Sequence, residues 1–230
     1  MLRLERAEIA QGAFRLTADF TLEIARKYAV IGPSGAGKST LLNALCGFIP
    51  FSAGRLFWQT NDITHAAPGQ RPMTMLFQDN NLFPHLTITQ NVGLGIRPDL
   101  RLSKAEIERV DQSLLRVGLL DHQRKLPGAL SGGQQSRAAL ARVLVQARPV
   151  VLLDEPFAAL GPALRNEMLD LVHDLVTETN ATLVMVSHAP EDVRRIADQV
   201  IFVAQGTAHA PKGVADIMDD PPPALREYLG

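Results

Sequence analysis

The chain has 230 residues, of which 46% are hydrophobic and 20% charged, and its formal net charge is −1. This length allows one large domain, and the near-zero charge gives no electrostatic reason to expect bulk nucleic-acid binding. The one cysteine, Cys46, excludes an internal disulfide, so we expect a reducing compartment and a buried structural thiol. No signal-peptide core opens the chain and no apolar run approaches the roughly 18 residues that cross a bilayer, so we expect neither secretion by that route nor a membrane span.

The first part of the chain predicts β-structure. Residues 2–24 alternate apolar and polar side chains, which is typical of strands with one solvated face. Short strands are also predicted at 28–31, 55–59 and 73–77. The run at 28–31 leads directly into a glycine-rich segment.

That segment, residues 32–40, fits the phosphate-binding pattern G-x-x-x-x-G-K-[ST] and reads Gly32-Pro33-Ser34-Gly35-Ala36-Gly37-Lys38-Ser39-Thr40. Its glycines let backbone N–H groups surround a phosphate, and the helix expected at 40–46 adds its positive N-terminal end. Lys38 can reach the outer phosphates and the Ser39 hydroxyl can ligate Mg²⁺. The alternative, a glycine-rich turn that matches by chance, is disfavoured by the strand and helix around it. We therefore expect ATP and Mg²⁺ as ligands.

From about residue 81 to 130 the pattern becomes helical. Ser103 and Glu106 have the spacing of a capping box, helical periodicity continues to residue 117, and Gly118 ends that helix. We expect a helical subdomain over about 81–130, inserted into an α/β core within one domain spanning 1–230.

Three apolar runs follow, at 150–153, 183–186 and 200–204. Continuous apolar runs that alternate with helices favour buried strands of a largely parallel sheet. The residues Pro221-Pro222-Pro223 predict a surface turn before a short C-terminal helix.

Two carboxylates, Asp154 and Glu155, end the run at 150–153. Ligand sites of open α/β sheets lie at the carboxyl ends of strands. Asp154 is thus expected to hold Mg²⁺, directly or through water, and Glu155 to orient and deprotonate the attacking water. The alternative is a helix N-cap followed by a first-turn acid.

A second glycine-bearing segment reads Leu130-Ser131-Gly132-Gly133-Gln134-Gln135, with a helix expected from about 135 to 146. It places another anion-binding helix N-terminus in the same chain. An ordinary serine N-cap with a glycine turn is the alternative. One nucleotide needs one phosphate site, so a second requires an explanation.

In their order and spacing, five features resemble the ATPase subunits of ABC transporters over nearly the whole chain: the phosphate loop, Gln78, residues 130–135, Asp154-Glu155 and His188. The resemblance implies a P-loop NTPase core of the ABC ATPase type, with an N-terminal antiparallel β subdomain and the inserted helical subdomain. It also implies a homodimer packed head to tail. The signature residues Ser131, Gly132, Gly133 and Gln134 would then act in trans on ATP held by the other subunit.

The resemblance assigns further roles. Gln78 would contact Mg²⁺ or water and sense the membrane subunit, and His188 would lie at the γ-phosphate and stabilise developing charge. The alternatives are a solvated loop glutamine and a surface histidine. Phe14 is the candidate for stacking on adenine, although it could equally be a strand core residue.

Two departures from the family stand out. Gly161 replaces the aspartate that commonly ends the segment Ala158-Ala159-Leu160-Gly161, which affects communication between the two sites or the hydrolysis rate. The segment Ala25-Arg26-Lys27-Tyr28 lacks the usual glycine turn, which affects the hairpin rather than the chemistry.

Within the family, residues 75–87, 154–160, 162–168 and 186–188 most resemble the ATPases of thiamine importers. This implies a bacterial importer ATPase, peripheral on the cytoplasmic face of the inner membrane, that energises uptake of thiamine or its phosphates. Its partners would be two integral permease subunits and, through the complex, a periplasmic solute-binding protein, without nucleic acid. Importers of iron(III), sulfate, molybdate or polyamines are near alternatives.

Two other function classes remain open. A soluble ABC ATPase acting on ribosomes or DNA is disfavoured by the single phosphate loop and the lack of sustained heptads. A nucleotide-binding regulatory module without turnover is disfavoured by Glu155 and His188, whereas Gly161 weakly favours it.

Overall fold

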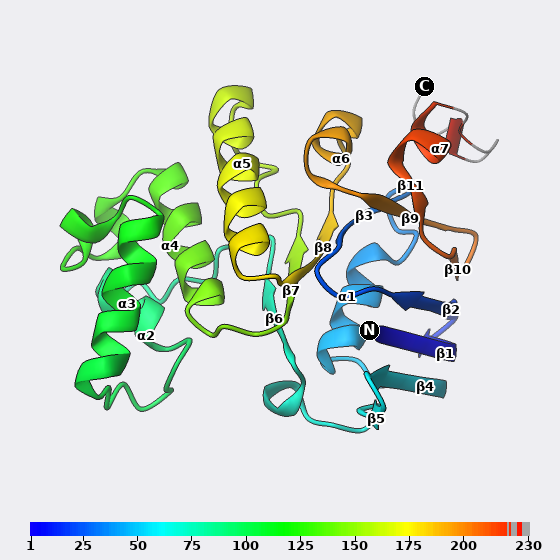
Figure 1. The fold of residues 1–230 in the computed structure, drawn as a ribbon, viewed down its shortest axis with the longest axis horizontal. Coiled ribbons are helices and arrows are strands. Elements are labelled where there is room, and N and C mark those ends of the chain that lie inside the picture. Colours follow the sequence, from blue (N-terminus) through cyan, green and yellow to red (C-terminus); the bar gives the residue numbers. More distant parts are fainter. Residues whose placement is uncertain (220, 222–224, 227–230) are drawn as a thin grey trace.

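The computed structural model describes residues 1–219, 221 and 225–226 (Figure 1). Its strands are β1 (Leu2–Gln11), β2 (Phe14–Leu22), β3 (Lys27–Ile31), β4 (Ala53–Trp58), β5 (Asn61–Asp62), β6 (Met73–Leu76), β7 (Val150–Asp154), β8 (Thr182–Val186), β9 (Gln199–Ala204), β10 (Thr207–Ala208) and β11 (Lys212–Gly213). The α-helices are α1 (Lys38–Cys46), α2 (Ile88–Gly93), α3 (Lys104–Arg116), α4 (Gly132–Leu144), α5 (Pro162–Glu178), α6 (Pro190–Ile196) and α7 (Val214–Met218). Short 3₁₀ turns lie at η1 (Pro68–Gln70), η2 (Leu120–His122) and η3 (Pro127–Ala129).

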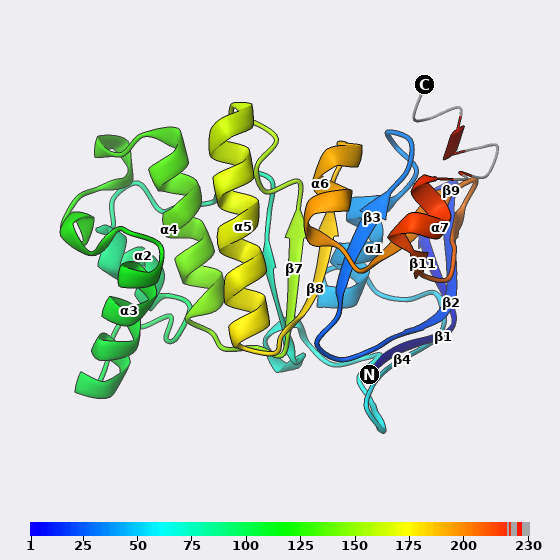
Figure 2. The ribbon, with the colours of Figure 1, turned by 45° about the horizontal axis from the view of Figure 1, so that its top comes forward.

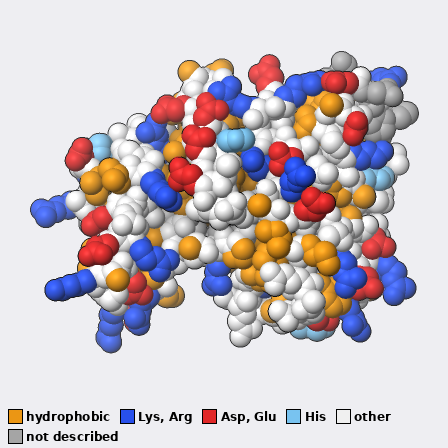
Figure 3. All heavy atoms as spheres, viewed as in Figure 1, with side chains coloured by type: hydrophobic (Ala, Val, Ile, Leu, Met, Phe, Trp, Pro, Cys, Tyr) orange, Lys and Arg blue, Asp and Glu red, His pale blue; other side chains and the backbone are white. Residues whose placement is uncertain are grey.

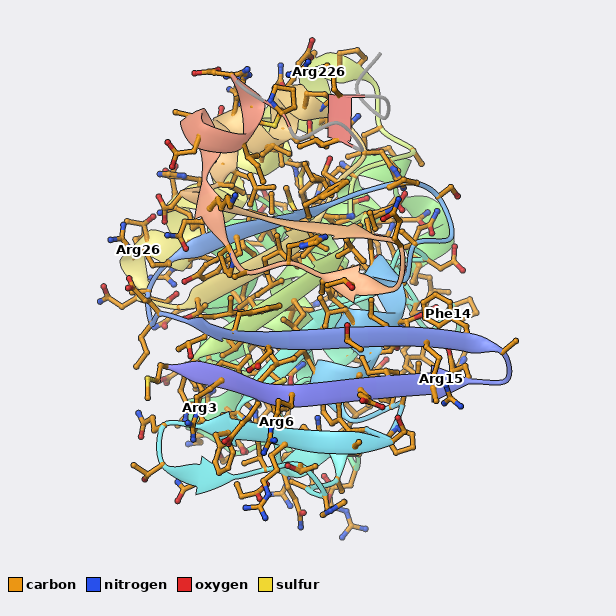
Figure 4. All side chains as sticks on the ribbon, turned by 90° about the vertical axis from the view of Figure 1, so that its right-hand side faces the viewer. Arg3, Arg6, Phe14, Arg15, Arg26 and Arg226 are labelled. Carbon is orange, nitrogen blue, oxygen red and sulfur yellow. The ribbon has the colours of Figure 1, made fainter. Side chains whose placement is uncertain are left out.

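The N-terminal strands form an antiparallel ribbon that follows from their alternating sequence. β1 pairs with both β2 and β4, and β4 pairs with β5. Figure 4 shows β1, β2 and β4 side by side. Along β2 the side chains alternate between buried and exposed, as the sequence predicted. This confirms the strands expected within residues 2–24 and at 55–59.

The central strands β6, β7, β8, β3 and β9 pair in that order, and every pair is parallel. The five apolar runs predicted as strands are confirmed, with boundaries that shift by one or two residues. β7 and β8 are buried along their whole length. Both faces of this sheet are therefore covered, which explains why these runs are continuously apolar.

Helix α1 lies between the antiparallel N-terminal strands and the central parallel strands. Helices α4, α5 and α6 stand in a row beside the parallel strands (Figures 1 and 2). Val150 and Leu152 of β7 pack with α1 and the antiparallel strands, whereas Val151 and Leu153 pack with α4 and α5. Alternate side chains of one strand thus belong to two different cores. The α/β fold class with an antiparallel N-terminal part is confirmed.

Helices α2, α3 and α4 share a further hydrophobic cluster that includes Ile88, Val110 and Ala141. The predicted capping box of α3 is confirmed, since Glu106 N donates to Ser103 Oγ at 3.3 Å and Ser103 N to Glu106 Oε2 at 2.7 Å. A helical subdomain with limits near 81 and 130 stays a prediction. The helix expected to start at 135 starts instead at Gly132, because Ser131 is the N-cap and the glycines form the first turn.

Two buried side chains secure the core around α1. Cys46 is buried as expected, and burial raises the pKa of its thiol to about 12. Arg71 is 2% exposed and donates to Ala44 O at 2.7 Å and Leu45 O at 2.6 Å, carbonyls of the last turn of α1. It therefore satisfies the carbonyl groups that a helix leaves unpaired at its C-terminus.

The turn before β3 is made without glycine, as the sequence indicated: Ala25 has a left-handed φ of 57°. The predicted turn at 221–223 and the short helix after it lie largely outside the described residues. In the part of the chain that is described, no helix has both the length and the apolar character needed to span a bilayer.

Candidate nucleotide site

The loop between β3 and α1 needs its glycines for space and for backbone conformation. Gly32, Gly35 and Gly37 all have positive φ, between 75° and 148°. A Cβ on Gly32 would lie 2.0 Å from Val203 O, and one on Gly37 would lie 2.6 Å from the Phe14 ring. The loop thus fits against β9 and Phe14 only because glycine stands at these positions.

Helix α1 starts from this loop with its N-terminal end open. Its N-cap, Gly37, makes no side-chain cap, and the first turn holds no acidic residue. Lys38 is buried, and its Nζ donates to Gly32 O at 2.8 Å and Pro33 O at 2.9 Å. Desolvation lowers the pKa of Lys38, with Glu155 and Asp154 acting in the opposite direction. Free N–H groups, the helix dipole and an ammonium therefore converge where an anion can bind.

The end of β7 brings a carboxylate to this helix. Ser39 Oγ donates to Asp154 Oδ1 at 3.0 Å, and Asp154 is 8% exposed. Burial raises the pKa of Asp154 above its ordinary value, and the Ser39 hydrogen bond opposes that shift. A hydroxyl and a desolvated carboxylate are suitable ligands for Mg²⁺ bound mainly through phosphates. Among the residues described, no group of three or more His, Cys, Asp or Glu side chains forms a separate metal site.

The next residue, Glu155, meets His188. Glu155 has a left-handed φ of 47°, which is strained for a non-glycine residue, and follows directly after β7. His188 lies just after β8, which pairs with β7. His188 Nε2 and Glu155 Oε1 are 2.6 Å apart. The two side chains are 40% and 19% exposed, so a carboxylate and an imidazole stand together at an accessible edge of the sheet.

Lys38, Ser39, Glu155 and His188 line one open cleft of about 360 Å³, whereas Asp154 is not among its lining residues. Its lining residues are Gln11, Phe14, Ser34, Gly35, Gly37, Lys38, Ser39, Thr40, Glu155 and His188. Phe14 stands near the turn between β1 and β2 (Figure 4). Gln11, at the end of β1, was not foreseen, because a glutamine at a strand end carries no motif.

Gln78 and the signature segment lie outside this cleft. Gln78 is exposed, two residues beyond the end of β6, and the β6–β7 register brings it level with Glu155. The signature segment begins α4, where Gln134 N donates to Ser131 Oγ at 3.3 Å. A Cβ on Gly132 would meet open space, whereas one on Gly133 would lie 2.4 Å from Leu164 Cδ2 of α5. A side chain at position 133 would therefore have to displace the Leu164 side chain, whereas Gly132 leaves the helix end open.

Comparison with known proteins agrees with this geometry. Residues 17–158 match the family described as ABC transporter. The chain is 57% identical to the thiamine import ATP-binding protein ThiQ of Ruegeria sp. (strain TM1040) and 56% identical to the protein of that name in Cereibacter sphaeroides, over 100% of each chain. A dimeric, post-hydrolysis structure of the ATP-binding cassette MJ0796 with ADP and Pi has a TM-score of 0.80 and 26% identity, covering 93% of this chain and 99% of that one.

This chain belongs to the ABC transporter family. It is a nucleotide-binding ATPase whose hydrolysis is coupled to transport, and the P-loop core expected from its motifs is confirmed.

Proposed function

We propose that this chain is the ATP-hydrolysing subunit of a bacterial importer of thiamine or its phosphates. The observation that carries the proposal is the identity of 57% and 56%, over full length, to two proteins named for thiamine import. The motifs of an ATPase do not contact the solute. The site residues therefore do not distinguish thiamine from other small solutes, and the experiment below compares thiamine with those solutes.

In the proposed mechanism, Phe14 stacks on adenine and the phosphates lie at the N-terminus of α1, residues 32–40. Lys38 turns from the carbonyls of its own loop to the outer phosphates. Ser39, Asp154 and Gln78 would hold Mg²⁺, and that ion would supply positive charge to neutralise the phosphates.

Glu155 then orients the attacking water and accepts its proton. His188, in contact with Glu155 in the structure, donates to the γ-phosphate as charge develops there. Phosphoryl transfer depends mainly on positioning and electrostatics. Glu155 and His188 therefore contribute to catalysis by holding a fixed geometry relative to each other.

The site is completed by a second copy. The ends of α1 and α4 do not meet in one cleft of this chain, since no described residue of α4 lines the nucleotide cleft. We infer that Ser131, Gly132, Gly133 and Gln134 close over the nucleotide of the partner subunit. The dimeric state of the MJ0796 cassette bound to ADP and Pi supports this arrangement.

The membrane subunits are proposed to dock near Gln78 and the helical part, which places the dimer on the cytoplasmic face of the inner membrane. Exposed aromatic side chains lie beside the Gln78 loop: Phe48 is 52% exposed, with its ring 5.6 Å from that of Phe77, and Phe83 is 46% exposed. They offer an apolar surface to a permease helix. Two permease subunits and a periplasmic solute-binding protein complete the importer.

The test is affinity capture of tagged Glu155→Gln from detergent-solubilised native membranes with ATP present, read by mass spectrometry. Recovery of a polytopic permease supports the importer, and its solute-binding protein is then titrated with thiamine, thiamine phosphates, sulfate, molybdate, iron(III) and polyamines. Preference for thiamine compounds is the expected result. Preference for another solute would overturn the substrate, and capture of ribosomal or DNA-repair proteins without a permease would overturn transport.

A further inference from the structure

A polar cluster next to His188 does not line the nucleotide cleft, but lines a separate pocket that Glu155 and His188 share. It consists of Arg165 of α5, Asp192 of α6 and Ser187, the residue before His188. The Asp192 carboxylate is 8% exposed and accepts from Ser187 Oγ at 2.6 Å and from Arg165 Nε at 3.1 Å. Arg165 Nη2 also donates to the same oxygen of Asp192. The side chains of Ser187 and Arg165 thus converge on one carboxylate oxygen of Asp192, Oδ2, through three hydrogen bonds.

The cluster fixes the backbone on both sides of His188. Ser187 N donates to Val30 O of β3 at 3.3 Å, and Ala189 N donates to Ser187 Oγ at 3.1 Å. His188 therefore sits in a turn that the Ser187 hydroxyl closes, and Asp192 orients that hydroxyl. Little freedom remains for the residue that bears the imidazole.

The same cluster joins the two chain segments that leave the site. Glu155 leads through a short loop to α5, where Arg165 N donates to Gly161 O at 2.9 Å in the first turn. His188 leads to α6, which carries Asp192. Contact between Arg165 and Asp192 therefore links the element after Glu155 to the element after His188.

We propose that Arg165, Asp192 and Ser187 form a positioning unit that holds His188 Nε2 against Glu155 Oε1. The inference rests on the catalytic roles proposed above for Glu155 and His188. Loss of the unit leaves nucleotide binding intact, because none of its residues lines the cleft that holds the phosphate loop. It lowers the rate of hydrolysis, since a displacement of about 1 Å at a reacting group can cost on the order of a hundredfold.

The chain offers a matched control on the same two helices. Arg195 of α6 donates to Asp170 of α5 through two bonds of 2.7 and 2.6 Å. That pair is 41% and 54% exposed, and acidic and basic side chains are interspersed over α5 and α6 on the face in Figure 3. Both pairs tie α5 to α6, but of the two only the less exposed pair, Arg165 and Asp192 at 26% and 8%, contacts Ser187, the neighbour of His188.

The experiment compares Ser187→Ala, Arg165→Gln and Arg195→Gln in the assembled transporter, with kcat and KM for ATP measured separately. Ser187→Ala removes only one hydroxyl. If Arg165→Gln does not fold, the result for Ser187→Ala alone tests the proposal. We expect kcat to fall about tenfold in Ser187→Ala and about a hundredfold in Arg165→Gln. KM for ATP should stay within about twofold, Arg195→Gln should match the wild type, and Ser187→Thr should restore kcat because it keeps the hydroxyl.

Wild-type kcat in Ser187→Ala would overturn the positioning unit, as would an equal loss of kcat in Arg195→Gln. Glu155→Gln and His188→Ala are assayed beside them. If these two also keep wild-type kcat, the proposed catalytic roles fail. If they lose it while Ser187→Ala does not, only the positioning unit fails.

Discussion

Two helices of this chain begin at glycine-bearing segments, and their N-termini are built differently. At α1, three glycines of the loop have positive φ, no side chain caps the helix, and Lys38 is buried beside it. At α4, Ser131 caps the helix through a capping box and neither Gly132 nor Gly133 has a positive φ. Glu155, His188 and Phe14 share a cleft with the α1 end, whereas no described residue of α4 lines that cleft.

The difference indicates that the two helix N-termini have different roles in nucleotide binding. The α1 end carries unsatisfied donors and a desolvated cation, features that bind phosphate at a cost in stability. The α4 end is self-satisfied within the chain and presents an open surface at Gly132. We infer that the α1 end binds a nucleotide by itself, whereas the α4 end acts on a nucleotide held by another copy of the chain. The predictions below break or sharpen this contrast, from the largest expected effect to the smallest.

Glu155→Gln removes the proposed base from the α1 site and leaves its phosphate-binding groups in place. We expect kcat for ATP hydrolysis to fall about a thousandfold, the usual range for loss of a general base, with ATP affinity retained. Steady-state ATPase assays and a nucleotide titration measure the two quantities. A variant with wild-type turnover would show that Glu155 is not the base.

Gly132→Asp places a negative charge at the α4 end, where a Cβ meets open space. The isolated chain should bind ATP as before, but hydrolysis in the transporter should fall about a hundredfold, because the added carboxylate repels the partner's phosphates. Gly128→Asp is the matched control, since Gly128 is also exposed, open to a Cβ and close in sequence. Equal losses in both variants would contradict a specific role for the signature segment.

Asp154→Asn tests the free-energy cost of keeping an ionised carboxylate buried at the α1 site. Burial raises the folded pKa of Asp154 above its ordinary 3.8, so the ionised form is penalised at neutral pH. The penalty is fully present above the folded pKa and disappears as pH falls through the folded pKa toward 3.8. We expect Asp154→Asn to raise the Tm of the nucleotide-free chain by about 2–4 °C at pH 7, less near pH 4, and to lose most of the added stability from Mg-ATP. A lower Tm at pH 7 would contradict this.

Gly161→Asp should have the smallest effect. Gly161 is the N-cap of α5 with φ −64°, makes no side-chain cap, and would place a Cβ in open space. Aspartate there gains a cap and a favourable helix dipole worth about 0.5 kcal/mol, or about 1–2 °C in Tm. Scanning calorimetry measures it. An unchanged or lower Tm would show that the loop before α5 does not accept the cap.

The sequence predicted a structural feature where the residues that form it lie close together along the chain. The capping box at Ser103 joins residues three apart, so its spacing was visible in the sequence. The box at Ser131 has the same spacing but was not predicted, and the start of its helix was expected after the glycines rather than at Gly132. The buried strands were visible because both faces are covered. Arg71 was not, because its partners Ala44 and Leu45 are distant in sequence.

The same limit applies to the site. Lys38, Ser39, Asp154 and Glu155 belong to contiguous motifs and were proposed from them. The link from His188 through Ser187 and Asp192 to Arg165 crosses two helices, and nothing in the spacing of these residues indicates it. The left-handed backbone of Glu155 was equally invisible, because no sequence preference marks a strained non-glycine residue.

The central claim is that the α4 end of one copy completes the α1 site of another. Size-exclusion chromatography with light scattering on Glu155→Gln, with and without Mg-ATP, tests it directly. The account predicts a monomer of 25.0 kDa without nucleotide, a dimer with Mg-ATP, no dimer once Gly132→Asp is added, and a dimer retained with Gly128→Asp. A dimer that survives Gly132→Asp, or a chain that stays monomeric with saturating Mg-ATP, would contradict it.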